Sequence, residues 1–496
     1  MARDFPEKIP EHLLQELDTV IGLLGLTHEE AERFHQNVRR PAEGYFMDFW
    51  KRKSGTSAVK GMNDFSRLLA PHAIKQVILR KPALLFFPVE EVEKRAKDVC
   101  FVLGSEGMTY TAFLDAGARH PQVLMQKPET LIKNVRSVAE LFEADGLTIR
   151  QYLKACLTYP VLFTREGETI KSHVEQSIEA FEKYGWSRKD FLGAALKNPS
   201  LFNQRAESLT ANMETFRKTF APYGLKEETS SEILKKEPQL LTQSAKTLFD
   251  NARGVVERLG LKNEDFKAYL KALEKNPKLF YSSPDTMAER IKETARLFKP
   301  YGMQLSDFWH MGLSQPQLFT LRPRRLLRNV RRVVRAFAAD GLTVSKYVAG
   351  AVKQPSLFGM PPETIIGHVC QVVEKGKDFG IKQGAYIQAA IRQPALFASQ
   401  PETILKNMEK VHKLLAEMGL HKQKRETGAY LLSRPPLFNL SDENISLRYL
   451  YGCYLKHEGK PVSKTALMRS SKAKIERVAS KYTCPFLRLL KERQRT

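Results

Sequence analysis

The sequence predicts an all-α protein, a right- or left-curving α-solenoid of about ten 39-residue helix-pair repeats that form an elongated superhelix with a concave basic surface. Three observations predict it: a recurrent proline phrase, a recurrent glycine and a large positive charge. The prolines recur at one constant interval, from Pro82 through Pro121 and Pro160 to Pro394, and Pro435 follows slightly later than that interval. Helix pairs of this length cannot bury their apolar faces alone, so consecutive repeats must stack.

The glycine keeps the same spacing as the proline. It precedes the proline by the same distance along the chain in seven repeats: Gly107, Gly146, Gly185, Gly224, Gly302, Gly341 and Gly380. In the sixth repeat it slips, because Gly260 lies further from its proline, Pro277. We expect each glycine to adopt the left-handed conformation that closes the preceding helix.

Residues 146–184 illustrate one repeat, with a first helix (helix A) before the proline and a second (helix B) after it. Thr148 is the expected N-cap of helix A. The expected apolar face of helix A consists of Tyr152, Leu153, Cys156 and Leu157. The expected stripe of helix B consists of Ile170, Val174, Ile178 and Phe181. Helix B of this repeat begins with Gly-Glu-Thr, and sister repeats have Pro-Glu-Thr at 128–130, 362–364 and 401–403; both phrases suit a first helical turn.

The proline itself poses a physical question. In KNPSLF (197–202) it follows an apparent helix without a break. A proline inside a helix costs about 3 kcal/mol, because it removes a hydrogen bond and clashes with the preceding turn. We interpret Pro199 as the point where helix A ends or bends, so that Leu201 and Phe202 turn into the core.

The ends of the chain differ from the repeats. Residues 1–65 are expected to form an N-terminal helical cap, with a degenerate first repeat at 25–41. Residues 66–450 would hold the ten tandem repeats, and residues 451–496 a basic C-terminal helical tail or cap. The tail contains 12 basic and 3 acidic residues.

The net charge of +24 over 496 residues favours a polyanionic partner. We expect nucleic acid, DNA or RNA, as that partner, no membrane, no small-molecule substrate and a monomer. No run of 18 apolar residues, signal peptide or transit peptide is recognised, which favours a cytoplasmic or nucleoid-associated protein, with delivery to a host cell or organelle left open. The five cysteines lack metal or redox spacing. No catalytic motif is recognised, so we expect no enzyme, no metal and no cofactor.

The phrases at Pro160, Pro199 and Pro277, with Gly-Leu-Thr turns at 146 and 341, resemble the repeats of the mitochondrial transcription termination factor (mTERF) family. The resemblance covers roughly residues 66–450. It implies an α-solenoid whose basic concave face binds double-stranded DNA or RNA in organellar transcription, translation or ribosome assembly. The 39-residue period is longer and more regular than is usual in that family, so a bacterial or divergent relative and a convergent modular nucleic-acid reader both stay open.

The densest candidate contact is LRPRRLLRNVRRVVRAF (321–337), which has no acidic residue. Its expected phosphate contacts are Arg322, Arg324, Arg325, Arg328, Arg331, Arg332 and Arg335. On a helix Arg324, Arg328, Arg331 and Arg335 would form one stripe, with Leu327, Val330 and Val334 on the packed side. The alternatives are a solvated face or pairing with acidic residues of adjacent repeats. Lys472, Lys474 and Arg477 of the tail are further candidates.

A polar residue recurs at a fixed position after each proline, in the expected helix B. The set is Arg95, Asn134, His173, Asn212, Asn251, Arg290, Asn329, His368, Asn407 and Arg448. Either these side chains contact bases or phosphates, or each satisfies a backbone carbonyl freed by the helix-A proline. The narrow choice of residue types favours the structural role.

The residue before each proline varies more, as a base-reading position would. The candidates for one contact per repeat are Tyr159, Asn198, Glu237, Asn276, Gln315, Gln354 and Gln393. A tolerant surface position would vary in the same way. The sequence therefore predicts a non-catalytic protein that regulates transcription or RNA metabolism through a basic groove, and the alternative is a protein–protein interaction scaffold.

Overall fold

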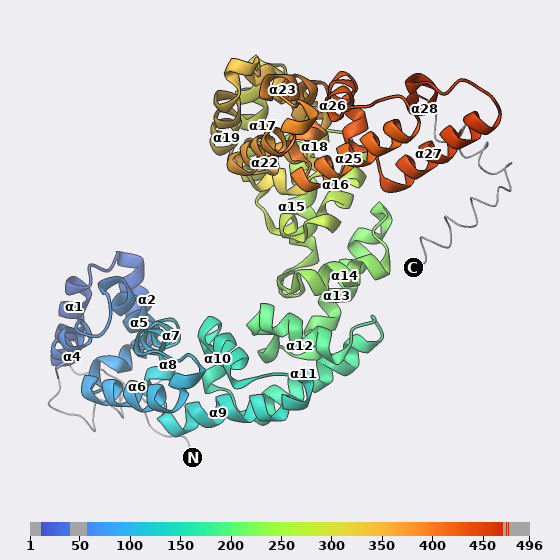
Figure 1. Cartoon of the computed structure of the whole chain (residues 1–496). Coiled ribbons are helices and arrows are strands. Elements are labelled where there is room, and N and C mark those ends of the chain that lie inside the picture. Colours follow the sequence, from blue (N-terminus) through green and yellow to red (C-terminus); the bar gives the residue numbers. More distant parts are fainter. Residues whose placement is uncertain (1–10, 40–56, 470–472, 474, 476–496) are drawn as a thin grey trace. The chain divides into compact units, whose positions relative to one another are not determined.

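The computed structural model describes residues 11–39, 57–469, 473 and 475, and these residues contain helices and turns but no strand. The chain divides into two compact units, Met1–Phe249 and Asp250–Thr496. Figure 1 shows that each unit is a succession of short helices that follow one another in chain order. The described residues of both units are therefore all-helical.

The α-helices of the N-terminal unit are α1 (Glu11–Leu23), α2 (His28–Arg39), α4 (Ala58–Phe65), α5 (Pro71–Arg80), α6 (Val89–Leu103), α7 (Tyr110–Arg119), α8 (Gln122–Met125), α9 (Pro128–Leu141), α10 (Ile149–Thr158), α11 (Gly167–Glu182), α12 (Arg188–Lys197), α13 (Ala206–Phe220) and α14 (Glu227–Lys236). Helices A pack on one another in the order α5, α7, α10, α12, α14. Helices B pack in the order α6, α9, α11, α13. The unit thus consists of two layers of helices.

The next helix, α15 (Ala245–Arg258), contains the boundary between the units. The α-helices of the C-terminal unit are α16 (Asn263–Lys275), α17 (Pro284–Phe298), α18 (Leu305–Ser314), α19 (Pro323–Ala336), α20 (Val344–Lys353), α21 (Ser356–Gly359), α22 (Pro362–Lys375), α23 (Gln383–Arg392), α24 (Ala395–Ala398), α25 (Pro401–Glu417), α26 (Lys424–Ser433), α27 (Asp442–His457) and α28 (Lys464–Arg469). The same two layers recur, with α16, α18, α20, α23 and α26 in one and α17, α19, α22, α25 and α27 in the other.

Short 3₁₀ turns complete the repeats. Those that begin at the proline are η2 (Pro82–Phe86), η5 (Pro160–Thr164), η6 (Pro199–Asn203), η8 (Pro238–Thr242), η9 (Pro277–Tyr281), η11 (Pro316–Thr320) and η14 (Pro435–Asn439). Those that precede the glycine are η3 (Gly104–Glu106), η4 (Glu143–Asp145), η7 (Ala221–Tyr223), η10 (Lys299–Tyr301), η12 (Ala338–Asp340) and η13 (Lys377–Phe379).

The proline does not interrupt a helix. Helix α12 ends at Lys197, Asn198 is its C-cap, and Pro199 is the first residue of the separate turn η6. Proline is well tolerated at a first helical position, because the backbone donor that it lacks would have no partner there. Leu201 and Phe202 are fully buried. The structure therefore avoids the cost of an interior proline and turns the Leu-Phe pair into the core.

Some of the proline turns have an additional side-chain hydrogen bond from the residue four positions after the proline. Where it is threonine, as at Thr164 and Thr320, its hydroxyl donates to the carbonyl three residues earlier at 2.9 and 2.7 Å, and the turn is a 3₁₀ helix. Where it is Met125, Gly359 or Ala398, the phrase closes instead into a single α-helical turn. The threonine hydrogen bond is compatible with the tighter i to i+3 geometry but is not required for it, because other 3₁₀ turns end in Phe86, Asn203, Tyr281 and Asn439.

The recurrent glycine closes the preceding helix as expected. Gly146 and Gly341 have φ of 86° and 82°, in the left-handed region that side chains other than glycine rarely adopt. The slipped glycine of the sixth repeat has a simple cause. Gly260 follows α15 without a 3₁₀ turn, and α16 is 13 residues long where the helices A of the neighbouring repeats have 10. The repeat length is preserved because helix A takes up the residues that the turn lacks.

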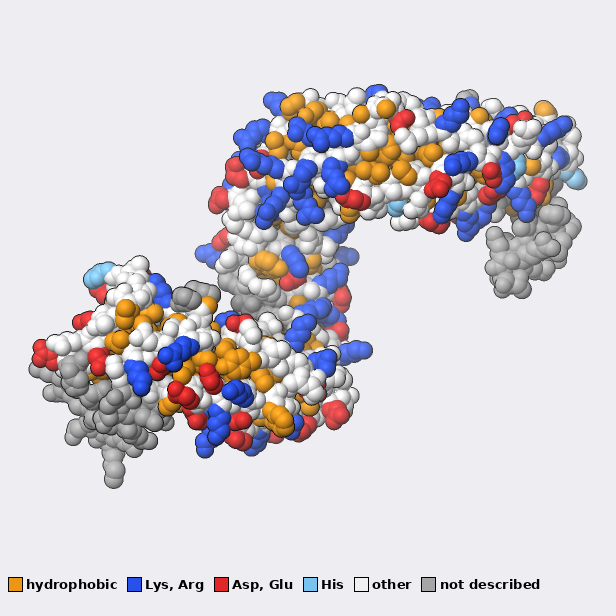
Figure 2. Space-filling view, turned by 60° about the vertical axis from the view of Figure 1, so that its left-hand side comes forward, with side chains coloured by type: hydrophobic (Ala, Val, Ile, Leu, Met, Phe, Trp, Pro, Cys, Tyr) orange, Lys and Arg blue, Asp and Glu red, His pale blue; other side chains and the backbone are white. Residues whose placement is uncertain are grey.

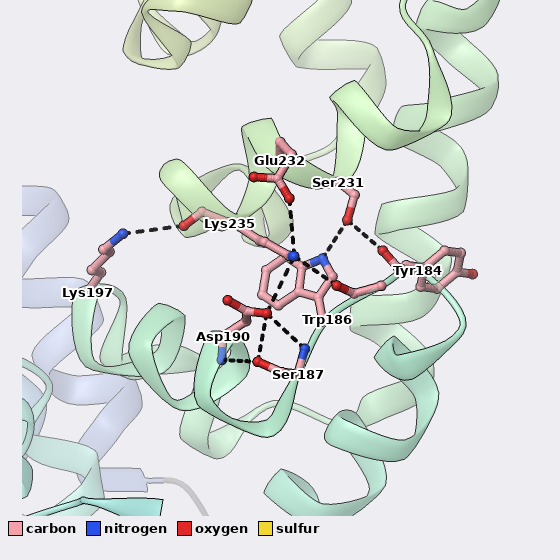
Figure 3. Close-up of polar contacts among 9 residues, drawn as sticks. Tyr184, Trp186, Ser187, Asp190, Lys197, Ser231, Glu232 and Lys235 are labelled. Atoms are coloured by element: carbon pink, nitrogen blue, oxygen red, sulfur yellow. Dashed lines mark hydrogen bonds and ion pairs between the residues drawn. The ribbon is translucent and has the colours of Figure 1, made fainter. Parts of the chain in front are cut away.

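Consecutive repeats are also joined by polar contacts at the glycine turn, which Figure 3 shows for the turn between Tyr184 and Trp186. Trp186 donates its indole N–H to the hydroxyl of Ser231 at 2.8 Å, and that hydroxyl donates to the carbonyl of Tyr184 at 2.8 Å. Lys235 donates to the Gly185 carbonyl at 2.8 Å. Ser231 and Lys235 lie on α14, the helix A that follows α12 along the chain, so these contacts hold the turn against the next repeat.

Candidate nucleic-acid interface

The positive charge is concentrated in the C-terminal unit. Residues 250–496 contain 44 Lys and Arg against 22 Asp and Glu, whereas residues 1–249 contain 35 against 33. The first unit is therefore nearly neutral. Figure 2 shows a group of Lys and Arg side chains on the part of the C-terminal unit that contains α19.

Helix α19 separates its apolar and charged residues. Its side chains Leu326, Val330 and Val333 are buried against neighbouring helices. The exposed side chains, which we call the arginine face, are Arg322, Arg324, Arg325, Arg328, Arg331, Arg332 and Arg335. Of the three residues expected on the packed side, Val330 and Val334 are buried, whereas Leu327 is half-buried and lies among the arginines.

Three of the seven arginines have polar partners on neighbouring repeats. Arg332 forms an ion pair with Glu363 at 2.5 Å, and Arg331 lies 3.4 Å from the hydroxyl of Tyr301. Arg324 lies 3.8 Å from Glu293, but its side chain is 91% exposed, so that pair contributes little. Among the described residues no carboxylate lies within ion-pair distance of the other arginines. Most of the arginine face is therefore charged and uncompensated.

Two hollows lie on either side of α19 and share Arg328 and Arg332. The hollow toward α17 has a volume of about 470 Å³ and includes Leu297, Leu327 and, besides Arg328 and Arg332, three further arginine-face residues. The hollow toward α22 has a volume of about 360 Å³ and includes Arg325, Asn329, Phe358, Gly359 and Glu363. An anion placed in either hollow would meet several guanidinium groups, which bind phosphate oxygens with paired N–H donors.

The three tail candidates, Lys472, Lys474 and Arg477, lie outside the described residues.

The recurring polar residue forms hydrogen bonds between consecutive repeats. Asn134 is buried and donates its side-chain amide to the Phe163 carbonyl at 2.9 Å. The matching bonds join Asn212 to Leu241 at 2.8 Å, Asn251 to Phe280 at 3.4 Å, Arg290 to Phe319 at 3.3 Å and Asn407 to Phe438 at 2.9 Å. The acceptor is thus the last carbonyl of the next repeat's proline phrase, rather than a carbonyl in helix A of the same repeat.

Arginines at the two ends of the series reach similar carbonyls. Arg95 donates to the carbonyl of Met125, and to that of Gln126 at 3.2 Å. Arg448 is buried and donates to the carbonyl of Leu467 on α28. Burial lowers the pKa of the Arg448 guanidinium below its ordinary value.

Three members of the series make no such bond. The Nδ1 atoms of His173 and His368 are buried without a hydrogen-bond partner among the described residues. Burial, followed by the charges of Arg205 and Arg165, lowers the pKa of His173 below its usual value. The third exception is Asn329, whose amide forms no hydrogen bond within the described part of the chain and lines the hollow toward α22.

The residue before each proline is half-buried at the C-cap of helix A in every candidate repeat, that is at Tyr159, Asn198, Glu237, Asn276, Gln315, Gln354 and Gln393. Three of these side chains bond to the residue two positions later. Asn198 accepts from Ser200 at 2.9 Å, Gln315 accepts from Gln317 at 2.6 Å, and Gln354 donates to Ser356 at 2.9 Å. In these three repeats the candidate base-reading group folds back onto its own turn.

Sequence reasoning missed a second set of contacts between repeats, made by cations two positions before the proline. Arg119 donates to the Thr158 carbonyl at 3.1 Å, and Arg392 donates to the Leu432 carbonyl at 2.6 Å. Both acceptors belong to the last turn of the next helix A, where a cation also compensates the negative end of the helix dipole. Arg80 and Lys197 make the same kind of contact. The available signal was a basic residue at this position in most repeats.

Neither a candidate membrane-spanning helix nor a cluster of three or more metal-binding side chains is found in the described part of the chain.

Fold and site together define an all-helical repeat protein with one strongly cationic helix face. The mTERF family model matches residues 74–338, which is more than half of the chain, and the protein belongs to the mTERF family. The proline turns continue beyond the matched range, at Pro355, Pro394 and Pro435. A search of the curated proteins gives no match to the chain.

Proposed function

We propose that the protein binds nucleic acid through the arginine face of α19 and regulates gene expression by occupying DNA or RNA, without catalysis. The observation that carries the proposal is the run of seven exposed arginines between Arg322 and Arg335, most of them without a carboxylate partner in the described structure. Like charges one helical turn apart destabilise a helix. A polyanion would relieve that repulsion, which gives the arginine face a function rather than a purely structural role.

Family membership supports the same conclusion, because it agrees with the nucleic-acid-binding solenoid that the proline phrases suggest. The charge distribution adds to it: the net charge of residues 250–496 is close to that of the whole chain. Phosphate groups attract such a surface without regard to base sequence, and they release counterions on binding. Binding should therefore weaken steeply as salt increases.

Selection from pooled random oligonucleotides tests the proposal. The full chain is incubated with random DNA and RNA pools, single- and double-stranded, at low and at moderate salt, and the retained molecules are sequenced and titrated. We expect salt-sensitive retention of at least one pool. Failure to retain any pool at low salt would contradict the proposal and favour a protein-interaction scaffold.

A further inference from the structure

Asn329 occupies the same repeat position as Asn134, Asn212, Asn251 and Asn407 but lacks their hydrogen bond. Those four side chains donate to the last carbonyl of the next proline phrase. The corresponding phrase after Asn329 forms the α-helical turn α21, and Asn329 instead lines the hollow toward α22 together with Phe358 and Gly359 of that phrase. An amide that holds two repeats together elsewhere is here available to a ligand.

The hydrogen-bond donors around the Asn329 amide are arginine guanidinium groups. Arg325, Arg328 and Arg332 line the same hollow as Asn329, so it presents three guanidinium groups and one amide. The only carboxylate that lines it is Glu363, which pairs with Arg332 at 2.5 Å. A ligand that matches this set must be an anion rich in acceptors and able to compete with a carboxylate. A phosphodiester meets both conditions, since its oxygens accept paired guanidinium donors.

The hollow toward α17 provides a second position where a phosphate can bind. It lies on the other side of Arg328 and Arg332, so the same two side chains can contact anions in both hollows. Its lining also includes Leu297 and Leu327, which suit the apolar surface of a sugar or base next to a phosphate. A nucleic-acid strand carries phosphates and apolar groups in this alternation, whereas a single small anion would use only one hollow.

We propose that two neighbouring phosphodiesters of one nucleic-acid strand bind in the two hollows, with Arg328 and Arg332 between them. Asn329 donates its amide to the phosphate on the α22 side, and Glu363 is the competitor that this phosphate displaces from Arg332. The inference rests on the proposed function and deepens it, because it assigns the phosphate-binding site to one junction between repeats.

Asn329 and Asn407 provide a matched pair for the test. Both are asparagines at the same position of their repeats, but Asn407 is buried and bonded to the Phe438 carbonyl at 2.9 Å. Asn329→Ala should reduce affinity about 10- to 150-fold, the range expected for one hydrogen bond to a charged group, with an unchanged melting temperature. Asn407→Ala should lower the melting temperature and leave the affinity unchanged.

Charge variants give the second readout. Binding is measured with the full chain and labelled random-sequence probes of matched length, a single-stranded RNA and a DNA duplex, over a range of salt. Arg328→Gln should weaken binding and reduce the slope of log affinity against log salt by about 1, whereas Asn329→Ala should leave the slope unchanged. Glu363→Gln should strengthen binding, because it removes the competing carboxylate.

The possible outcomes distinguish a wrong phosphate-binding site from a wrong proposed function. If the full chain binds with steep salt dependence, but Asn329→Ala, Arg328→Gln and Glu363→Gln all bind as the parent does, the site is wrong and the proposed function stands. If the full chain binds neither probe at low salt, the proposed function fails and the site fails with it. Equal losses of affinity in Asn329→Ala and Asn407→Ala would also overturn the assignment, because they would indicate a shared structural role.

Discussion

Replacing the recurring asparagine by alanine should destabilise the protein in proportion to the hydrogen bond that the structure shows. Asn134 is 5% exposed and donates to the Phe163 carbonyl at 2.9 Å, a normal length for an N–H···O bond. Its removal leaves a carbonyl unsatisfied between two repeats. Such a loss costs about 1–3 kcal/mol, more than the net value of the bond itself.

The other asparagines differ in their hydrogen bonds, so we expect their alanine variants to lose different amounts of unfolding free energy. Asn407→Ala should cost about the same, since its burial and bond length are the same as those of Asn134. Asn251 donates at 3.4 Å, longer than a usual hydrogen bond, so Asn251→Ala should cost less than about 1 kcal/mol. Asn329 is half-buried and forms no hydrogen bond within the described residues, so Asn329→Ala should lie within about 0.5 kcal/mol of the parent.

Denaturant unfolding measures the free energy of unfolding of each variant, and hydrogen exchange shows which part of the chain is affected. A long repeat protein need not unfold in one step, so exchange of the amides in the affected proline turn locates the loss. For Asn134→Ala the faster exchange should be confined to η5 and the helices around it. Equal destabilisation by Asn329→Ala and Asn134→Ala would refute the claim that the hydrogen bond, rather than the asparagine itself, stabilises the repeat junction.

Two further predictions concern His173 and the glycines. As the pH falls, His173 is protonated near pH 6.5 in the unfolded chain but only at lower pH in the folded chain, because burial lowers its pKa there. The contribution of His173 to stability is therefore present above pH 6.5 and is lost as the pH falls below it. His173→Asn, which restores the donor found in other repeats, should raise the melting temperature and reduce its fall between pH 7.5 and 5.5; an equal fall would contradict this. Gly302→Ala should destabilise by about 1–2 kcal/mol because φ is 95° there, whereas Gly367→Ala, in the interior of α22 with open space around it, should stabilise by about 0.5–1 kcal/mol. Thermal melts measure both, and the same sign for the two glycines would count against the reasoning.

Local rules made much of each repeat predictable. Thr148 caps α10 with Gln151 in a capping box, and Gly146 is left-handed, because both depend on a few neighbouring residues. The buried stripe of α11 was predictable for the same reason, since its apolar residues recur with the helical period. The proline was recognisable as a boundary, but not as the first residue of a separate turn, because that depends on how the next helix packs.

Contacts between repeats were less predictable. The position of Asn134 was visible in the sequence, but its acceptor, the Phe163 carbonyl, belongs to the next repeat and is set by the stacking of helices B. The half-burial of Leu327 was unpredictable for a related reason, because the sequence does not show how wide the buried face of α19 is. The loss of the hydrogen bond at Asn329 was not visible at all, since the sequence shows the same residue type at the same spacing.

The salt dependence of nucleic-acid binding tests the role of the arginine face most directly. Log affinity for the probe that the full chain binds, the single-stranded RNA or the DNA duplex, is measured against log salt for the full chain and for a variant with Arg328, Arg331 and Arg335 changed to Gln. If these arginines contact phosphates, the slope of the variant should be shallower by about 2–3. Identical slopes and affinities for the two proteins would contradict the account and place the binding surface elsewhere.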